Sequence, residues 1–450
     1  MWYPPVGMPE NIALVVLDTL RYDAFEEHFD WLPGVRFTNA YSTSHWTVPA
    51  HGSLFTGRYP SEIGVHSKSA SLDCPDETLA ESLSAAGYET RLWSANPNTM
   101  FWEGWDRGFS QVLEPGSLDP RHVNAVDWTA FLGDIDTHSW TKYPRSVLHA
   151  VRADCSTVAA MKQGYRRMTT SDADGGGEDV LARARDTDFG APEFTYVNLM
   201  EAHAPYHTPE SVDADSLNVV VGDAFADSVD SPERLRASYD VSAAYLSEIY
   251  EEIFAELRKE FDYVVTVSDH GEMLGEHGMW NHGYGLYPEL THVPVVVSGD
   301  GVESRRDDAT VSLLDVHRTI LDLAGVDAPA DARGQSLLDD PASRTYLTEY
   351  HGFLDRHREQ FERKGVVEAF ERYDGRLHGI ATPPDFYGYQ TDETADRAEG
   401  EFRSTGESRL DDPRAELETR VDELDVRTVD AGQAEVTEDV EERLETLGYA

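Results

Sequence analysis

The sequence predicts an α/β fold with a mostly parallel central sheet and helices on both faces, followed by a small C-terminal α+β region. Two observations carry this prediction. Short apolar runs rich in β-branched residues recur along much of the chain, and stretches with helical spacing lie between them. Strands that alternate with helices are typical of parallel sheets, whose strands are buried on both faces.

The individual elements follow from this pattern. Buried strands are predicted at Asn11–Leu17, Tyr88–Trp93, Phe194–Leu199, Tyr263–Val267 and Val293–Val297. Helices are predicted at Glu77–Gly87, Arg234–Lys259 and Leu313–Ala324. The first of these helices ends at a glycine, the residue preferred just beyond a helix C-terminus.

The chain divides into a main domain at 9–340 and a smaller acidic region at 341–450, which finishes in a helical segment, Glu438–Leu447. Residues 115–188 interrupt the alternation of strands and helices. They contain one helical stretch, Val147–Met168, and a glycine-rich loop, Ser171–Asp179. Because long segments without strands are usually functional or disordered, we expect an insertion or lid near the site.

Charge limits the classes of partner. The chain has 84 acidic and 37 basic residues, a formal net charge of −47. This charge repels nucleic acid and anionic lipid, so we expect no nucleic-acid partner. Acidic residues occur along the whole chain, as on the surface of a halophilic protein from a high-salt cytoplasm, where ions screen the repulsion.

The sequence also predicts a cytoplasmic protein. Its two cysteines, Cys74 and Cys155, are too few for a disulfide framework and show no metal-ligand spacing. The first residues lack the basic start and apolar stretch of a signal peptide. No apolar run approaches the roughly 20 residues needed to cross a bilayer, so no membrane span is expected.

Acidic residues follow two of the predicted strands. Asp18 ends the first strand run, and Asp269 with His270 follows Tyr263–Val267. Open parallel sheets bind ligands at the carboxyl ends of their strands. A single aspartate there is more simply a helix cap, but two with an adjacent histidine favour one divalent metal, Mn²⁺, Mg²⁺ or Ca²⁺.

Thr47 begins a third chemical element, the segment TVPAHGSLFTG. A threonine two residues before a proline is typical of an N-capped helix start. Its hydroxyl would lie at the positive end of the helix dipole, which favours an oxyanion ligand and helps deprotonate a nucleophile. A plain N-cap is the alternative interpretation.

Four segments in order resemble the sulfatase family of the alkaline-phosphatase-like superfamily. They are NIALVVLDTLRYDAF, WTVPAHGSLFTGRYPSEIGV, LMEAHAPYHTP and VSDHGEMLGEHGMWNHGYGLYPELTHVPVVV. The terminal ERLETLGYA is also similar. The resemblance covers roughly residues 9–350 and implies an alkaline-phosphatase-like fold and a metal-dependent ester hydrolase.

The resemblance also implies roles for single residues. Asp18, Asp269 and His270 fall on metal ligands; Thr47 falls on the nucleophile and is a further candidate ligand. His203 falls on the acid/base histidine. His282 replaces a lysine that binds the sulfate oxygens, and His51 replaces the arginine of the nucleophile motif. His277 and His292 are weaker candidates, for which a supporting or structural role is at least as well favoured.

This sequence departs from the family at several positions. Threonine cannot become the formylglycine that sulfatases make from cysteine or serine at the position of Thr47. Asp18-Thr19 stands where many members have two aspartates, and Ser94–Asn98 replaces their Lys-x-His segment. Asp, Thr, Asp and His together resemble the phosphoglycerol transferases of the superfamily, which use threonine as nucleophile beside one metal, commonly manganese.

We therefore expect a metal-dependent hydrolase acting on a sulfate or phosphate ester, including phosphodiesters. The substrate would be a small-molecule, glycan or lipid head-group ester. Two alternatives stay open: a phosphoglycerol-type transferase, and a catalytically inactive member that binds anions. The threonine favours a phosphoester because a phospho-threonine can be hydrolysed with metal help.

Overall fold

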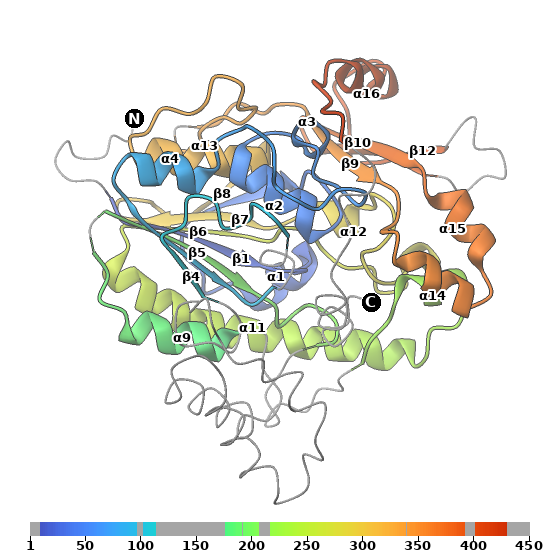
Figure 1. Cartoon of the computed structure of the whole chain (residues 1–450), viewed down its shortest axis with the longest axis horizontal. Coiled ribbons are helices and arrows are strands. Elements are labelled where there is room, and N and C mark those ends of the chain that lie inside the picture. The colour runs from blue at the N-terminus through green and yellow to red at the C-terminus, as the bar shows by residue number, and fades with distance from the viewer. Residues whose placement is uncertain are drawn as a thin grey trace, which may run out of the picture.

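An eight-stranded sheet forms the centre of the molecule (Figure 1). The computed structural model describes residues 10–96, 102–113, 176–190, 192–206, 217–338, 340–391 and 401–429. In the order β4-β3-β5-β1-β6-β7-β2-β8, its strands are Gln111–Leu113, Glu89–Ser94, Glu193–Leu199, Ile12–Leu17, Tyr263–Val267, Val295–Gly299, Val35–Tyr41 and Arg305–Ser312. Only β7 runs antiparallel to its neighbours, which confirms the predicted mostly parallel sheet.

Helices cover both faces of the sheet (Figure 1). One face carries α2 (Thr47–Thr56), α4 (Leu79–Ala85) and α13 (Leu313–Leu323), and the other carries α1 (Tyr22–His28), α9 (Gly177–Asp186) and α11 (Pro232–Glu260). The side chains of β1 alternate between the two apolar cores: Ile12, Leu14 and Val16 belong to the first, Ala13, Val15 and Leu17 to the second. A strand buried on both sides explains the uninterrupted apolar run in the sequence.

The C-terminal region forms a second sheet, as predicted. Its strands, all antiparallel, are β9 (Tyr346–His351), β10 (Arg376–Thr382), β11 (Phe386–Thr391) and β12 (Glu401–Thr405), with helices α14 (His357–Arg363), α15 (Val367–Tyr373) and α16 (Pro413–Asp422). Glu349 joins this sheet to the main one. Its backbone N–H donates to Thr43 O at 2.9 Å, and its buried carboxylate accepts from Ser61 N at 2.8 Å and Ser61 Oγ at 2.7 Å.

Short elements complete the main region: α3 (Pro60–Ile63), α10 (Val221–Phe225), α12 (Pro288–Thr291) and a 3₁₀ turn at Glu276–Gly278. The last two lie in the connection between β6 and β7. Because β7 runs opposite to β6, this connection crosses the edge of the sheet at which the parallel strands end.

Several expectations need correction. Strands β2, β4 and β8 were not predicted. β4 is only three residues long. β8 begins with four charged residues, and only its second half, Ala309–Ser312, is buried. Gly177–Asp179 belongs to α9, not to a loop; Glu178 and Asp179 favour a helix N-terminus through the dipole. The predicted helices Val147–Met168 and Glu438–Leu447 lie outside the described residues.

Within the described ranges, no helix is long and apolar enough to span a membrane.

Candidate active site

The polar residues predicted to act in chemistry meet at one edge of the main sheet. Asp18 follows β1, Asp269 and His270 follow β6, His203 follows β5, and Thr47 opens the helix after β2. These four strands point the same way, so their carboxyl ends share one edge, the place where open α/β sheets bind ligands.

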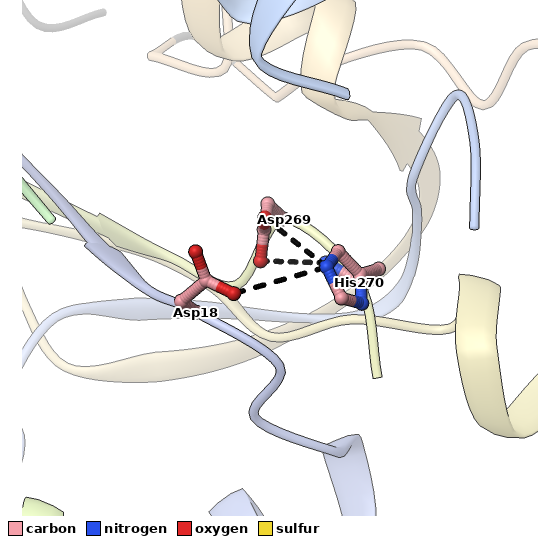
Figure 2. A group of neighbouring side chains, drawn as sticks. All are labelled: Asp18, Asp269 and His270. Carbon is pink, nitrogen blue, oxygen red and sulfur yellow. Dashed lines mark hydrogen bonds and ion pairs between the residues drawn. The ribbon is translucent and has the colours of Figure 1, made fainter. Parts of the chain in front are cut away.

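Asp18, Asp269 and His270 form a compact buried cluster (Figure 2). One ligand atom from each lies within 4.8 Å of the others, and all three side chains are fully buried. His270 Nε2 is 3.8 Å from Asp18 Oδ1 and 3.4 Å from Asp269 Oδ2. His270 Nδ1 donates to the Gly271 carbonyl at 2.9 Å, so neutral Nε2 turns its lone pair towards both carboxylates, as in a metal-binding histidine.

The charges of this cluster fit a divalent cation. Burial, and then the negative charge of Asp18, raise the pKa of Asp269. Burial opposes ionisation of Asp18 as well, but His203 and His270 lower its pKa below the usual range. Within the described part of the chain, no lysine or arginine pairs with either carboxylate, and Asp269 Oδ2 accepts no hydrogen bond. Two buried acids beside one imidazole lone pair are a ligand set for Mn²⁺, Mg²⁺ or Ca²⁺.

The Thr47 hydroxyl faces this cluster. Trp46, not Thr47, takes the N-cap position of α2, and no side chain caps the helix. The expected N-cap role of Thr47 is therefore wrong by one residue. Thr47 Oγ1 instead lies 3.3 Å from His270 Nε2 and 3.4 Å from Asn96 Nδ2, in a fully enclosed position. Its hydroxyl lies beside the Asp18–Asp269–His270 cluster.

Thr19 fixes the spacing of the two carboxylates. Its backbone N–H donates to Asp269 Oδ1 at 3.2 Å, and its hydroxyl donates to Asp18 Oδ1 at 2.9 Å. The residue has a φ of 63°, a conformation that is strained for a β-branched side chain. The second aspartate expected from the family is thus replaced by a strained hydrogen-bond bridge.

Asn96 is a site residue that the sequence analysis missed. Its Nδ2 donates to Asp18 Oδ2 at 2.7 Å and also approaches Thr47, and the side chain is fully buried. Asn198, on β5, donates to the same Asp18 oxygen at 3.2 Å. The signal for Asn96 was its place in the Ser94–Asn98 segment, which was noted only for lacking Lys-x-His.

Replacing Asn96 by alanine is expected to lower metal affinity or kcat/KM by about 10–100-fold, the usual effect of removing a group that orients a metal ligand. The metal-induced rise in melting temperature and the turnover rate measure the two effects. Asn39→Ala is the matched control, because Asn39 is a partly buried asparagine whose Nδ2 donates to Asp308 O and Pro384 O. Equal behaviour of the two variants would contradict a role for Asn96.

A pocket opens beside Thr47 and includes two of the predicted histidines. The lining residues include Thr47, His203, His282, His45 and Trp46, around a space of about 50 Å³, room for one small oxyanion or a few waters. His203 lies edge-on to His282 at 5.0 Å between ring centroids. His282 in turn lies 4.6 Å from the His270 ring.

Glu272 orients His282. His282 Nδ1 lies 3.2 Å from Glu272 Oε2, so this nitrogen donates to the carboxylate and Nε2 is left for the pocket side. Burial raises the pKa of Glu272 to about 7, and burial lowers the pKa of His203 to about 3. Glu272 was not predicted from the sequence, although it lies two residues after His270.

The other three histidines occupy supporting positions. His51 Nδ1 donates to the Thr47 carbonyl at 2.8 Å and lies 3.5 Å from Asp269 Oδ2, while its ring packs on Tyr196. The His51 ring therefore lies beside the Asp269 carboxylate. His292 stacks on Tyr22 and bonds Thr38 O at 2.9 Å, and exposed His277 stacks on Tyr287. These contacts favour structural roles for His277 and His292.

Comparison with known proteins places this site in a family context. The profile of the sulfatase family matches residues 11–326. A choline-sulfatase from Rhizobium meliloti is 25% identical over 362 residues, 71% of this chain and 68% of that protein. A low-salt glycan biosynthesis sulfotransferase from Haloferax volcanii is 27% identical over 339 residues, 72% of this chain and 64% of that protein.

Solved structures agree on the fold. The crystal structure of a phosphonate monoester hydrolase from Agrobacterium radiobacter superposes with a TM-score of 0.59 at 18% identity, covering 97% of this chain and 95% of that chain. At this identity the likeness concerns the fold alone. It includes the C-terminal region, since nearly the whole chain is aligned.

Proposed function

Because the chain belongs to the sulfatase family, we propose that it is a metal-dependent hydrolase that cleaves a phosphate or sulfate ester with Thr47 as nucleophile. One observation carries the proposal: the Thr47 hydroxyl lies 3.3 Å from His270 Nε2, at the mouth of a buried cluster of metal-ligand type. A threonine that served only to start a helix would not need its hydroxyl beside the histidine of this cluster.

Several residues of the site take part in the first half-reaction, each in a different role. A divalent cation bound by Asp18, Asp269 and His270 would supply Lewis acidity at the ester oxygens and lower the pKa of the Thr47 hydroxyl. Thr47 Oγ gives its proton to a water molecule in the pocket and forms a bond to phosphorus or sulfur, while the bond to the leaving oxygen breaks. His203 donates a proton to that oxygen; the negative charge of the bound ester favours the protonated imidazole that this step needs.

Water completes the reaction in the second half. His203, now neutral, takes a proton from a water molecule that attacks phosphorus or sulfur. The bond to Thr47 Oγ breaks, and Thr47 Oγ takes a proton back from solvent. Asn96 donates towards Thr47 Oγ1 and orients it in both halves. His282, oriented by Glu272, offers a hydrogen bond to a non-bridging oxygen of the ester.

The nucleophile favours phosphorus over sulfur. A phospho-threonine is hydrolysed by in-line attack of water with metal help. A sulfo-threonine lacks the second hydroxyl through which a formylglycine hydrate expels sulfate, so its release would be slow. We therefore propose a phosphomonoester or phosphodiester as the preferred substrate, with sulfate esters second.

A matched panel of nitrophenyl phosphate, phosphodiester and sulfate tests this preference. Purified protein in concentrated KCl with Mn²⁺, Mg²⁺ or Ca²⁺ is expected to turn over a phosphoester faster than the sulfate, with activity lost on chelation. The salt matches the expected high-salt surface. Turnover of the sulfate alone would show that the argument from sulfo-threonine is wrong.

Group transfer is the second candidate, favoured by the Haloferax volcanii relative, whose name describes a sulfotransferase. In this reaction an alcohol replaces water in the second half, and the ester group is passed to it. A product in which an added alcohol carries the phosphoryl or sulfuryl group distinguishes transfer from hydrolysis. An inactive anion-binding member would instead show metal binding with no turnover of any ester.

A further inference from the structure

Two buried histidines stack where the main region meets the second sheet. His66 lies in the connection that follows α3, and His351 ends β9, the strand whose Glu349 bonds Thr43 of the main region. The two rings are 4.7 Å apart between centroids and inclined by 14°. Each histidine is only 7% exposed. The rings therefore face each other across the junction of the two regions, shielded from solvent.

The residues next to this pair line the pocket beside Thr47. Ser67 follows His66, Gly352 follows His351, and both belong to the pocket wall. Ser67 Oγ donates to the His351 carbonyl at 2.7 Å, so a hydrogen bond joins the two segments beside the stacked rings. Separation of the two rings would therefore also widen the pocket.

Hydrogen bonds fix where the protons of the two rings lie. His66 Nδ1 accepts from the Lys68 backbone N–H at 3.2 Å, so this nitrogen carries a lone pair and Nε2 carries the proton. His351 Nε2 donates to Glu349 Oε2 at 3.4 Å. A further proton can bind His66 only at Nδ1, where it would displace the Lys68 N–H.

The charges around His66 also oppose its protonation. Burial, and then the nearby His351 and Arg376, lower the pKa of His66 to about 3, against the opposite effect of Glu349. Lys68 adds a smaller effect in the same direction as Arg376. His66 is therefore neutral while the junction is closed.

Glu349 cannot offset this cost, because its carboxylate has other partners. It accepts from Ser61 N at 2.8 Å and Ser61 Oγ at 2.7 Å, and it faces His378 on β10 as well as His351. Burial opposes ionisation of Glu349, but the hydrogen bond and charge of His351 lower its pKa below the usual range. It therefore stays ionised while histidines titrate, and its charge is shared among three imidazoles.

We propose that the His66–His351 stack is an acid-sensitive junction, which holds the second sheet against the main region while His66 is neutral and releases it when His66 takes up a proton. The pocket wall at Ser67 and Gly352 is the part of the site that this junction controls. Its effect on ester cleavage rests on the proposed function, whereas the junction itself does not.

The sign of the pH dependence follows from the two states of His66. In the open junction the ring is in water and titrates near pH 6.5, whereas in the closed junction it stays neutral to about pH 3. The closed junction is therefore fully stable above about pH 6.5 and loses stability as the pH falls. One proton taken up on opening lowers the ratio of closed to open molecules by about tenfold per pH unit.

Hydrogen exchange of the whole protein between about pH 7.5 and about pH 5 tests this junction, with rates corrected for the intrinsic pH dependence of amide exchange. Protection of β9 and of residues 61–69 is expected to fall with pH relative to that of β1 (Ile12–Leu17). His66→Phe keeps a ring for the stack but cannot take up a proton. In this variant the fall below pH 6.5 is smaller by about tenfold per pH unit.

Two more variants complete the test. His66→Gln keeps an acceptor for the Lys68 N–H and replaces His66→Phe where the latter folds poorly. His317→Phe is the control and keeps the wild-type pH dependence of β9, because His317 is a buried histidine of α13 that lies against Gly57 in the main region.

The same pH dependence of β9 in wild type and in the His66 variants overturns the proposal. So does an equal loss of protection in β1 and β9 of the wild type, which would mean that the whole fold opens in acid. Because exchange needs no substrate, either outcome is distinct from a failure of the proposed hydrolase activity.

Discussion

Thr47→Ala is expected to lower kcat/KM by at least about 1,000-fold, because the proposed covalent intermediate forms on the Thr47 hydroxyl. The hydroxyl lies 3.3 Å from His270 Nε2, so the substitution removes the proposed nucleophile from its place beside the cluster. Rates with the best ester of the nitrophenyl panel measure the loss. The metal-induced rise in melting temperature should largely remain, since Asp18, Asp269 and His270 are unchanged.

Two further variants make this result specific. Thr47→Ser keeps a hydroxyl at the same position and is expected to retain part of the activity. Thr56→Ala removes a buried threonine from the other end of the same helix, where its hydroxyl donates to Gly52 O at 2.8 Å. Near-normal rates for Thr47→Ala, or an equal loss in Thr56→Ala, would refute the nucleophile assignment.

Asp269→Asn is expected to abolish metal binding and to stabilise the metal-free protein. Asp269 and Asp18 are both fully buried without a lysine or arginine partner among the described residues, so ionisation of Asp269 is unfavourable in the metal-free protein and its pKa is raised. Because an asparagine of the same volume has no such ionisation cost, the variant should have a higher free energy of unfolding at neutral pH, on the order of 1 kcal/mol. A metal at 100 times its Kd stabilises the wild type by about 2.7 kcal/mol, a gain that the variant should lack.

Melting temperatures with and without Mn²⁺ measure both effects in one experiment. Asp300→Asn is the matched control, because Asp300 is exposed and pairs with Arg258 at 2.6 Å. This control should keep the metal-induced stabilisation. A variant at Asp269 that melts lower than wild type without metal, and still gains stability with it, would contradict the ligand assignment.

The sequence was sufficient to predict that Asp18, Asp269 and His270 lie together, because these residues directly follow strongly apolar strands. Asp18 and Asp269 each follow a buried run, and parallel strands bring such ends together. The same reasoning failed where the strand signal was weak. β8 begins with charged residues, so its alternation with the helices was not visible.

Residues that act through geometry were harder to find. Asn96 lies after a predicted strand, but a lone asparagine has many structural roles, and only its 2.7 Å contact with Asp18 reveals its place. Five residues of the C-terminal region, between Gly352 and Gln360, also line the pocket beside Thr47, and no motif marks them. Contacts between such distant segments depend on how the two sheets pack.

Acid quenching during turnover, followed by mass spectrometry of the peptide that contains Thr47, tests the central claim most directly. We predict one added phosphoryl or sulfuryl group on Thr47 when a reactive nitrophenyl ester and metal are present, and none after chelation. Steady turnover with an unmodified Thr47, or with the group on another residue, would contradict the proposed mechanism.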